Sequence, residues 1–453
     1  MQGWLCLWIL IFTAVETARV VVPLRSKETQ FPYSRIILMN TSKYIAQAAR
    51  NCTSIIANPP TEQKNAVLLK MAKLLDVHRE EILAANQADV TTAQKNNLPP
   101  NLVARLQWSG AKINSRIAAL HKIANLPDPV GQIFEPITCS NGIKACRMRV
   151  PLGVILMIYE ARPHVTINAG AFCLKSGNAV ILRGGSEAKN CNQKLGELWQ
   201  TALADVGLPT EAIQVVSGYH EQIHELLQLN CSIDLVIPRG GTKLIETISK
   251  TSKIPVLKHY NGICHVYIDE GADLHSALEI ALDSKCLMPE VCNAMETLLV
   301  HCSFCDHLAR IVKAFQDNDV QVKGCDRVRH AVPEVETATE QDWQTEYLDR
   351  KISIRVVGEV EEAIAHINQW GSHHTDAIVT DSQSRAELFV NQVDSAVVLV
   401  NASTMFCDGE TLGMGAEIGI ATGKLHARGP MGLQELTSYK FVVQGSGHIM
   451  GIQ

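Results

Sequence analysis

The stretch Gly153-Val-Ile-Leu-Met-Ile-Tyr-Glu-Ala-Arg-Pro163 sets a pattern that recurs along much of the chain. It opens with a short run that is apolar at every position, continues into a turn that contains a proline, and leads into a helical pattern as far as Leu174. A second unit of the same kind starts at Ala179-Val-Ile-Leu182 and turns at Arg183-Gly-Gly-Ser-Glu187. Short strands that are apolar on both faces and alternate with helices indicate a parallel sheet covered on both sides. The sequence therefore predicts an α/β fold.

The pattern continues on both sides of these units. Helical spacing of apolar residues precedes them from Ser42 to about Ile123. Further strands of the same sheet are expected at 213–216 and 235–237. A second α/β unit is expected from Ile254-Pro-Val-Leu257 onward, with strands at 266–268, 320–322, 352–357, 377–379 and 396–400. Two doubly wound α/β domains follow from this arrangement.

A small β element accompanies the two domains. Apolar and polar residues alternate over 133–150 around the turn Ser140-Asn-Gly142, which predicts a hairpin. Near the end of the chain, Lys440-Phe-Val-Val443 has the composition of a last strand. We expect this strand to pair with the hairpin.

Composition narrows the class of protein. The chain has 453 residues, 46% of them hydrophobic and 19% charged, with a net charge of −5, so it lacks the basic footprint of a nucleic-acid or membrane-surface binder. Its 14 cysteines are scattered without regular metal-ligand spacing, which favours reduced thiols. Cys302 and Cys305 form one isolated C-x-x-C, and no metal site is expected.

Cys292 is a candidate nucleophile. It lies between the break Pro289-Glu290 and the apolar run Leu298-Leu-Val300, a junction that can present a thiol to a ligand. From the spacing alone, the more common role of a cysteine as a small buried hydrophobe stays open.

Two glycine-rich turns are candidates for binding phosphate. Gly184-Gly185-Ser186-Glu187 and Arg239-Gly240-Gly241-Thr242 each follow a strand and precede a helix, so bare backbone amides and a helix N-terminus can approach an anion. Two such turns in one sheet suggest a dinucleotide, with Arg183 as a partner for a 2′-phosphate. Ordinary tight turns remain the alternative, because neither G-x-G-x-x-G nor a P-loop motif occurs.

Several ordered blocks closely resemble the gamma-glutamyl phosphate reductase family, a branch of the aldehyde dehydrogenase superfamily. The resemblance runs from about Met39 to the end of the chain. Its main blocks are Tyr159-Glu-Ala-Arg-Pro-His-Val-Thr166, Leu174-Lys-Ser-Gly-Asn-Ala-Val-Ile-Leu-Arg-Gly-Gly-Ser-Glu-Ala188, Val236-Ile-Pro-Arg-Gly-Gly241, Gly262-Ile-Cys-His265, Val291-Cys-Asn-Ala-Met-Glu-Thr-Leu-Leu-Val300, His373-His-Thr-Asp376 and Leu425-His-Ala-Arg-Gly-Pro-Met-Gly-Leu433.

The resemblance implies an aldehyde dehydrogenase-like organisation. It implies an NADPH-binding domain over 39–258, whose hairpin 132–150 belongs to an oligomerisation flap. A catalytic domain over 259–432 carries Cys292, and its last part returns to the cofactor domain. Residues 433–453 supply the C-terminal strand of the flap, and residues 1–38 lie outside the resemblance.

The implied reaction is the reduction of L-glutamyl 5-phosphate by NADPH to glutamate 5-semialdehyde and phosphate, the second step of proline biosynthesis. Cys292 is implied as the nucleophile that forms a thioester, with the oxyanion stabilised by its backbone amide and the Asn293 region. Where hydrolytic relatives resemble each other in a Glu-Leu-Gly-Gly block, this chain has His259-Tyr-Asn-Gly262, so the water-activating glutamate is missing, as a reductase requires.

The resemblance also suggests residues that bind ligands. Glu346 matches the glutamate that holds the nicotinamide ribose, and the two glycine-rich turns supply the remaining cofactor contacts: Arg183, Gly184, Gly185, Ser186, Glu187, Arg239, Gly240 and Gly241. The candidates for substrate binding are Arg162, Lys175, His259 and His265. The chain departs from the family pattern at Met405, where an arginine is usual, and at Leu287-Met288.

Two other functions stay open at this point: an oxidative NAD-dependent semialdehyde dehydrogenase, and a non-catalytic protein that keeps the fold. We also expect a homo-oligomer, a separate glutamate 5-kinase that supplies the substrate, and a cytoplasmic location without membrane or nucleic-acid partners. The apolar run Trp4 to Val15 resembles a signal peptide without a clean cleavage site, and Met39 is an alternative start.

Overall fold

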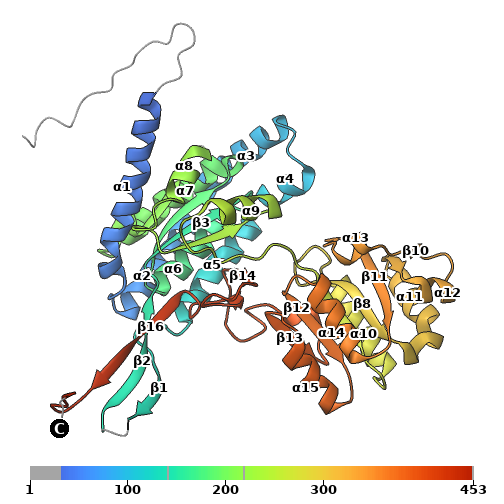
Figure 1. Ribbon diagram of the computed structural model, residues 1–453. Coiled ribbons are helices and arrows are strands. Elements are labelled where there is room, and N and C mark those ends of the chain that lie inside the picture. Colours follow the sequence, from blue (N-terminus) through green and yellow to red (C-terminus); the bar gives the residue numbers. More distant parts are fainter. Residues whose placement is uncertain (1–31, 140–141, 218–219, 451–453) are drawn as a thin grey trace, which may run out of the picture.

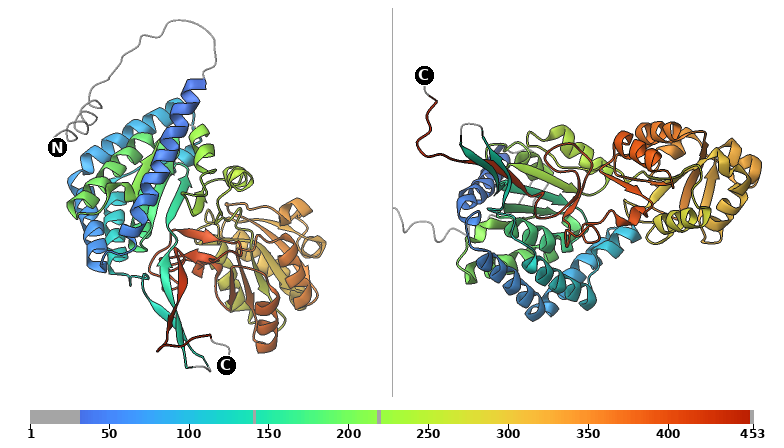
Figure 2. Two further views of the ribbon diagram at one scale, coloured as in Figure 1. Left: turned by 60° about the vertical axis from the view of Figure 1, so that its left-hand side comes forward. Right: turned by 90° about the horizontal axis from the view of Figure 1, so that it is seen from below.

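The computed structural model describes residues 32–139, 142–217 and 220–450, with side chains from Thr41 onward except that of His220. Two α/β lobes lie side by side, and a β arm projects from the first lobe (Figures 1 and 2). The signal-like run Trp4 to Val15 lies outside the described residues. No described helix is long and apolar enough to cross a bilayer.

The first lobe is built on a four-stranded parallel sheet of order β5-β4-β3-β6. On β3, Ile155, Met157 and Tyr159 pack against one helical layer, while Val154, Leu156 and Ile158 face the other. This alternation explains why the strand is apolar at every position. The strands are β3 (Val154–Tyr159), β4 (Ala179–Gly184), β5 (Ile213–Val216) and β6 (Leu235–Arg239).

Helices cover both faces of this sheet. One face carries α2 (Thr61–Val77), α5 (Gly110–Asn125), α6 (His164–Lys175) and α7 (Lys189–Asp205), with α3 (Arg79–Lys95) and α4 (Pro100–Leu106) packed outside them. The other face carries α1 (Pro32–Ile56), α8 (His220–Leu226) and α9 (Thr242–Thr251). Helix α1 begins before Met39, the alternative start considered from the sequence. Short 3₁₀ turns are η1 (Ser186–Ala188) and η2 (Thr210–Ala212).

The second lobe holds a seven-stranded parallel sheet of order β10-β9-β11-β8-β7-β12-β13. Its strands are β7 (Cys264–Ile268), β8 (Met295–His301), β9 (Gln321–Gly324), β10 (Glu336–Thr337), β11 (Lys351–Val357), β12 (Thr375–Val379) and β13 (Val397–Val400). One face packs against α10 (Leu274–Cys286), α11 (Leu308–Gln316) and α12 (Asp326–Ala331), and the other against α14 (Val360–Trp370) and α15 (Gln383–Gln392). Shorter helices are α13 (Glu340–Trp343), η3 (Cys302–His307) and η4 (Thr404–Phe406).

The α/β prediction is confirmed, although the second unit was expected to start at 254–257 and its first strand, β7, begins at Cys264. The apolar run at 254–257 forms a single bridge, Val236 to Val256, instead of a strand. Besides β10, two further short strands were not expected: β14 (Gly419–Ala421) and β15 (Gly429–Met431) pair antiparallel after the chain has left the second lobe. Ala421 and Met431 join the core of the first lobe, so the chain returns there before its end.

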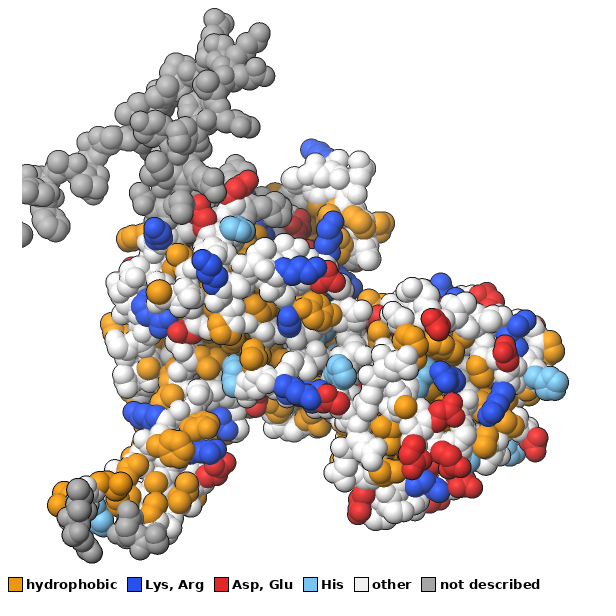
Figure 3. Space-filling model, viewed as in Figure 1, with side chains coloured by type: hydrophobic (Ala, Val, Ile, Leu, Met, Phe, Trp, Pro, Cys, Tyr) orange, Lys and Arg blue, Asp and Glu red, His pale blue; other side chains and the backbone are white. Residues whose placement is uncertain are grey.

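The β arm is an antiparallel sheet of β1 (Ile133–Thr138), β2 (Lys144–Pro151) and β16 (Thr437–Gln444). Strand β16 pairs with β2 from Thr437 opposite Pro151 to Gln444 opposite Lys144, which confirms the predicted pairing of the last strand with the hairpin. Ser140 and Asn141 of the predicted turn lie outside the described residues. The arm carries a gathering of apolar side chains (Figure 3): Ile133, Ile137, Tyr439, Phe441 and Val443 are all exposed.

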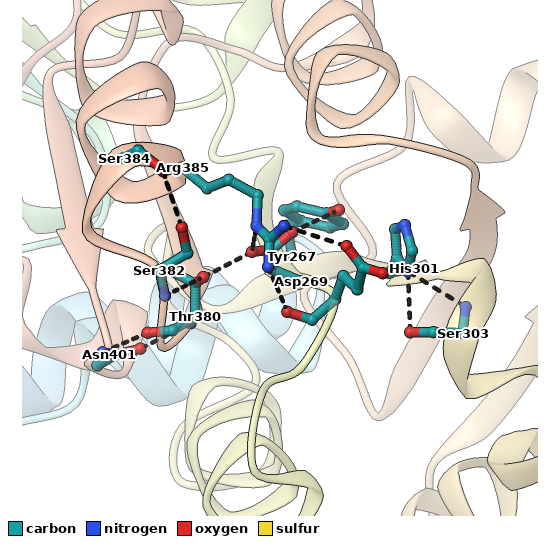
Figure 4. Close-up of polar contacts among 10 residues, drawn as sticks. Tyr267, Asp269, His301, Ser303, Thr380, Ser382, Ser384, Arg385 and Asn401 are labelled. Atoms are coloured by element: carbon teal, nitrogen blue, oxygen red, sulfur yellow. Dashed lines mark hydrogen bonds and ion pairs between the residues drawn. The ribbon is translucent and has the colours of Figure 1, made fainter.

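A polar cluster closes the carboxyl ends of β7 and β12 in the second lobe (Figure 4). The buried carboxylate of Asp269 accepts hydrogen bonds from the Tyr267 hydroxyl at 3.0 Å, from the Thr380 hydroxyl and from Nε of Arg385, both at 2.5 Å. Arg385 also pairs with Glu270 at 3.1 Å. Because these groups satisfy one another, this edge of the sheet is a structural junction.

Candidate active site

A cavity of about 900 Å³ lies between the two lobes and contains Cys292. The first lobe contributes the turns that follow β3 and β6, at the carboxyl ends of its strands. The second lobe contributes the segments just before β7 and β8, at the amino ends of its strands. The predicted site residues that line it are Arg162, Arg239, Gly240, Gly241, His259, Cys292, Asn293 and Glu346.

Cys292 is held by close backbone packing. It lies in the turn between α10 and β8. A Cβ atom on Gly262 would come within 1.7 Å of the Cys292 carbonyl oxygen, so only glycine permits this approach. The thiol of Cys264 donates to the same carbonyl oxygen at 3.3 Å. The segment before β7 therefore fixes the backbone of the candidate nucleophile.

The environment of the Cys292 thiol favours its neutral form. Burial raises its pKa to about 11; the guanidinium of Arg239 opposes the rise, while Glu346 and Glu417 add to it. The thiol is thus protonated at neutral pH in the free protein, and a thiolate is the stronger nucleophile. Loss of this proton must therefore be part of any chemistry at Cys292.

The side chain of Asn293 is committed to the neighbouring loop. Its amide nitrogen donates to the carbonyl oxygens of Thr404 at 3.2 Å and Met405 at 3.4 Å. Both protons of the amide group are used by these two contacts. Asn293 therefore holds the loop that carries Met405, and the backbone amide of Cys292 lies close to its own sulfur.

Glu346 reaches the cavity from the segment after α13. Its Oε1 atom accepts a hydrogen bond from the backbone amide of Gly262 at 2.7 Å. Burial raises the pKa of the Glu346 carboxyl, and the hydrogen bond from Gly262 opposes the rise. This contact links the glutamate to the glycine that packs on Cys292.

His259 and Arg162 also line the cavity. Burial, assisted by Arg239, lowers the pKa of His259 to about 4, and its Nδ1 atom lies 3.1 Å from the Ile420 carbonyl oxygen. A neutral imidazole that donates through Nδ1 leaves Nε2 as a proton acceptor. Burial, followed by repulsion from Arg239 and Arg105, lowers the pKa of Arg162 to about 10, so its guanidinium stays charged at neutral pH.

Backbone amides in the turns after β3 and β6 already donate hydrogen bonds to carboxylates. The amide of Gly241 donates to Glu160 at 2.8 Å, and the amide of Ala161 donates to Glu187 at 2.5 Å. Ala161 has a φ of 38°, a strained conformation for a residue with a side chain. Nε of Arg239 is buried without a hydrogen-bond partner in the described structure. Backbone N–H groups that donate to an anion, together with an unsatisfied guanidinium N–H, can bind a dinucleotide phosphate. These residues therefore fit a nicotinamide cofactor.

Arg183, Gly184, Gly185, Ser186 and Glu187 lie at the end of β4, beside the turn after β3, and do not line the cavity. A Cβ on Gly185 would meet the Glu187 carboxylate at 2.0 Å, so Glu187 folds back over this turn. Burial lowers the pKa of Arg183, and Glu187 opposes the shift. The turn thus lies outside the cavity, next to the turn after β3.

Two predicted substrate residues need correction, because neither lies at the cavity. His265 is fully buried in β7, where Nδ1 lies 2.7 Å from Asp376. Lys175 is fully buried at the end of α6, where Nζ donates to Asn65 at 2.6 Å and to the Ala124 carbonyl at 2.9 Å. Both side chains serve the interior of their lobes.

Several lining residues were missed from the sequence. Arg105 comes from the end of α4, and Glu417 from the segment that returns to the first lobe. His164 and Glu160 belong to the block after β3, where only Arg162 was singled out. The block itself was a usable signal for the last two, whereas no local pattern marks Arg105 or Glu417.

Comparison with known proteins gives concordant matches. The profile of the aldehyde dehydrogenase family matches residues 16–328. The chain is 47% identical to gamma-glutamyl phosphate reductase of Thermobifida fusca over 407 residues, 89% of this chain and 97% of the relative. It is 46% identical to the enzyme of that name from Carboxydothermus hydrogenoformans over 409 residues, 90% and 99% of the two chains. The crystal structure of gamma-glutamyl phosphate reductase from Thermotoga maritima matches with a TM-score of 0.88 and 41% identity, covering 90% of this chain and 100% of that one.

Proposed function

The chain belongs to the gamma-glutamyl phosphate reductases of the aldehyde dehydrogenase family, and we propose that it reduces L-glutamyl 5-phosphate to glutamate 5-semialdehyde through a thioester on Cys292. The observation that carries the residue assignment is the position of Cys292, fixed by Gly262 in a cavity that both lobes line. The second step of proline biosynthesis is the corresponding role.

Cys292 would attack the acyl carbon of the substrate. The sulfur–carbon bond forms, the bond from carbon to the phosphate oxygen breaks, and inorganic phosphate leaves with the electron pair. The neutral His259 is the proposed acceptor of the thiol proton, because Nδ1 lies 3.1 Å from the Ile420 carbonyl oxygen and, when it donates there, Nε2 is the acceptor. The backbone amide of Cys292 would stabilise the oxyanion.

The thioester must then be reduced instead of hydrolysed. Members of this family bind a nicotinamide cofactor, which supplies hydride to the acyl carbon. Hydrolytic aldehyde dehydrogenases share a glutamate that activates water. This chain has His259 at the matching position, so that carboxylate is absent there. His259 would return the proton as the semialdehyde leaves Cys292.

NADPH is the proposed form of the cofactor. Glu346 would hold the nicotinamide ribose, Gly240, Gly241 and Arg239 one phosphate, and the turn from Arg183 to Glu187 the adenosine end. The guanidinium of Arg183 suits a 2′-phosphate better than a ribose hydroxyl. Binding would require Glu160 and Glu187 to release the amides of Gly241 and Ala161, which they now hold.

The β arm supports a homo-oligomer. Tyr439, Phe441 and Val443 are 45%, 55% and 60% exposed on an edge strand, an unfavourable surface unless a second copy covers it. Phe441→Glu is expected to shift the molecular mass in light scattering toward the monomer. An unchanged mass would exclude the arm as the interface.

A separate glutamate 5-kinase is the proposed source of the substrate, since an acyl phosphate is too labile to accumulate. The cytoplasm is the proposed location, because NADPH and the kinase product occur there.

The proposed reaction is tested in its oxidative direction. Purified protein is mixed with pyrroline-5-carboxylate, NADP⁺ and phosphate, and NADPH formation is followed by absorbance. We expect activity that requires phosphate and is lost in Cys292→Ala. Activity without phosphate would instead identify a hydrolytic semialdehyde dehydrogenase, and a folded but inactive protein would point to the non-catalytic alternative.

A further inference from the structure

A second cavity, of about 450 Å³, lies beside the first and is lined by side chains from the α4–α5 region. Arg105, Arg162 and His164 line both cavities, so the two spaces are neighbours with a shared wall. Lys112 and Arg116 from α5 line the second cavity alone. The site described above makes no use of them.

The lining is cationic and is not neutralised. Among the described residues, no Asp or Glu lines the second cavity. Arg116 donates to neutral oxygens, that of Asn168 at 3.3 Å and the hydroxyl of Ser115 at 2.8 Å. Nζ of Lys112 donates to the carbonyl oxygens of Ala104 at 3.4 Å and Gln107 at 2.5 Å. In the described part of the chain, neither side chain forms an ion pair.

These cations repel one another across the cavity. His164 shows the effect, because burial and then the charges of Arg116, Arg162 and Arg239 lower its pKa to about 3. Unpaired like charges of this kind destabilise a fold, and an anion of charge −2 would relieve the repulsion. Guanidinium groups match the geometry of phosphate oxygens, and a neutral imidazole and a hydroxyl add donors.

We propose that the second cavity is a phosphate subsite, which receives the phosphoryl group of the acyl phosphate when it leaves the carbon attached to Cys292. The proposal rests on the proposed function. As the sulfur–carbon bond forms and the carbon–oxygen bond breaks, the electron pair stays on the phosphate oxygen and the group departs as inorganic phosphate. Arg162, which borders both cavities, would contact it first, and Arg116 and Lys112 would hold it. In the opposite direction the same subsite presents phosphate to the thioester.

Equilibrium binding tests the subsite without turnover. Inorganic phosphate is titrated into the full chain by calorimetry, with chloride keeping the ionic strength constant. Arg116→Gln and Lys112→Gln should each weaken phosphate binding about tenfold, as expected for loss of a charge-assisted hydrogen bond. Arg116→Lys should recover part of the affinity because it keeps the charge. The control is Lys95→Gln, an exposed cation on α3 that lines neither cavity and should bind phosphate like the unmodified protein.

Kinetics in the oxidative direction identify which anion uses the subsite. We expect the KM for phosphate to rise about tenfold in Arg116→Gln, with the KM values for the semialdehyde and NADP⁺ unchanged. A rise in the KM for the semialdehyde alone would assign the cavity to the substrate carboxylate, and a rise for NADP⁺ alone to the cofactor phosphate; either result overturns the proposal. Unchanged phosphate affinity in both Gln variants overturns it as well. If the protein has no turnover, calorimetry still tests whether the second cavity binds phosphate.

Discussion

A single methyl group at Gly262 should disable the enzyme. In Gly262→Ala the new Cβ would lie 1.7 Å from the carbonyl oxygen of Cys292 and 2.7 Å from its Cα. Both are backbone atoms, so no change of rotamer relieves the clash. The oxygen would have to move by about 1.7 Å to reach an ordinary contact of 3.4 Å. Such overpacking costs about 1–3 kcal/mol of folding free energy, and misplacing a reacting group by about 1 Å can lower the rate about 10²-fold.

The assay measures kcat in the oxidative direction, the thermal unfolding midpoint and the rate of Cys292 alkylation. We expect kcat to fall about 10²-fold while the protein stays folded. Gly423→Ala is the matched control, because nothing lies within 4 Å of its added Cβ and its φ is not left-handed. It should keep its activity and unfold at a similar or slightly higher temperature. Near-normal turnover in Gly262→Ala would refute the rigid placement of Cys292.

Three other predictions concern charge. Burial lowers the pKa of His164, His259, His366 and His374 from the usual value of 6.5 to about 3, 4, 2 and 3, respectively. As the pH falls below 6.5, only the unfolded chain binds protons at these histidines, so the free energy of unfolding should drop by about 1 kcal/mol per histidine per pH unit. Urea titrations between pH 6.5 and 5 measure this drop. Asp269→Ala removes the acceptor shared by Tyr267, Thr380 and Arg385 and should lower the free energy of unfolding by about 2–4 kcal/mol in the same urea titration. The KM values should not change, and a large rise in KM would show that the cluster takes part in catalysis. Arg239→Gln removes the cation that lowers the Cys292 pKa, so alkylation of the thiol at pH 8 should slow, and an unchanged rate would show that the guanidinium does not act on the sulfur.

The fold was predictable because its strongest signals are local. Strand β3 of the first lobe is apolar at every position because helices cover both faces of the sheet, and this pattern is visible in the sequence. The run at 254–257 has the same composition but forms a single bridge. Strands β14 and β15 have three residues each and depend on packing against the distant first-lobe core, which no local pattern records.

The site was less predictable than the fold, because two predicted residues, His265 and Lys175, lie buried inside a strand and a helix instead of at the cavity. His265 was a candidate substrate residue because it belongs to the block Gly262-Ile-Cys-His265 that carries the family resemblance. Strand geometry separates them: Gly262 stands before β7 and packs on Cys292, whereas His265 is already inside the strand and is buried against Asp376. Lys175 likewise ends a buried helix. Arg105 reaches the cavity only through the placement of α4 beside the second lobe.

The two sheets approach the cavity by opposite edges, and this explains which residues can meet there. In the first lobe the site lies at the carboxyl ends of the strands, the usual position for a doubly wound sheet, so Arg162 and Arg239 follow β3 and β6. In the second lobe, Asp269 and Arg385 close the carboxyl ends of the strands, and the cavity lies at the amino ends, where Cys292 precedes β8. In the function proposed above, a cofactor held by the first sheet would face Cys292 on the other, and the reacting carbon would lie between them. Domain motion that separates the lobes should accordingly lower kcat without removing any residue that contacts the substrate.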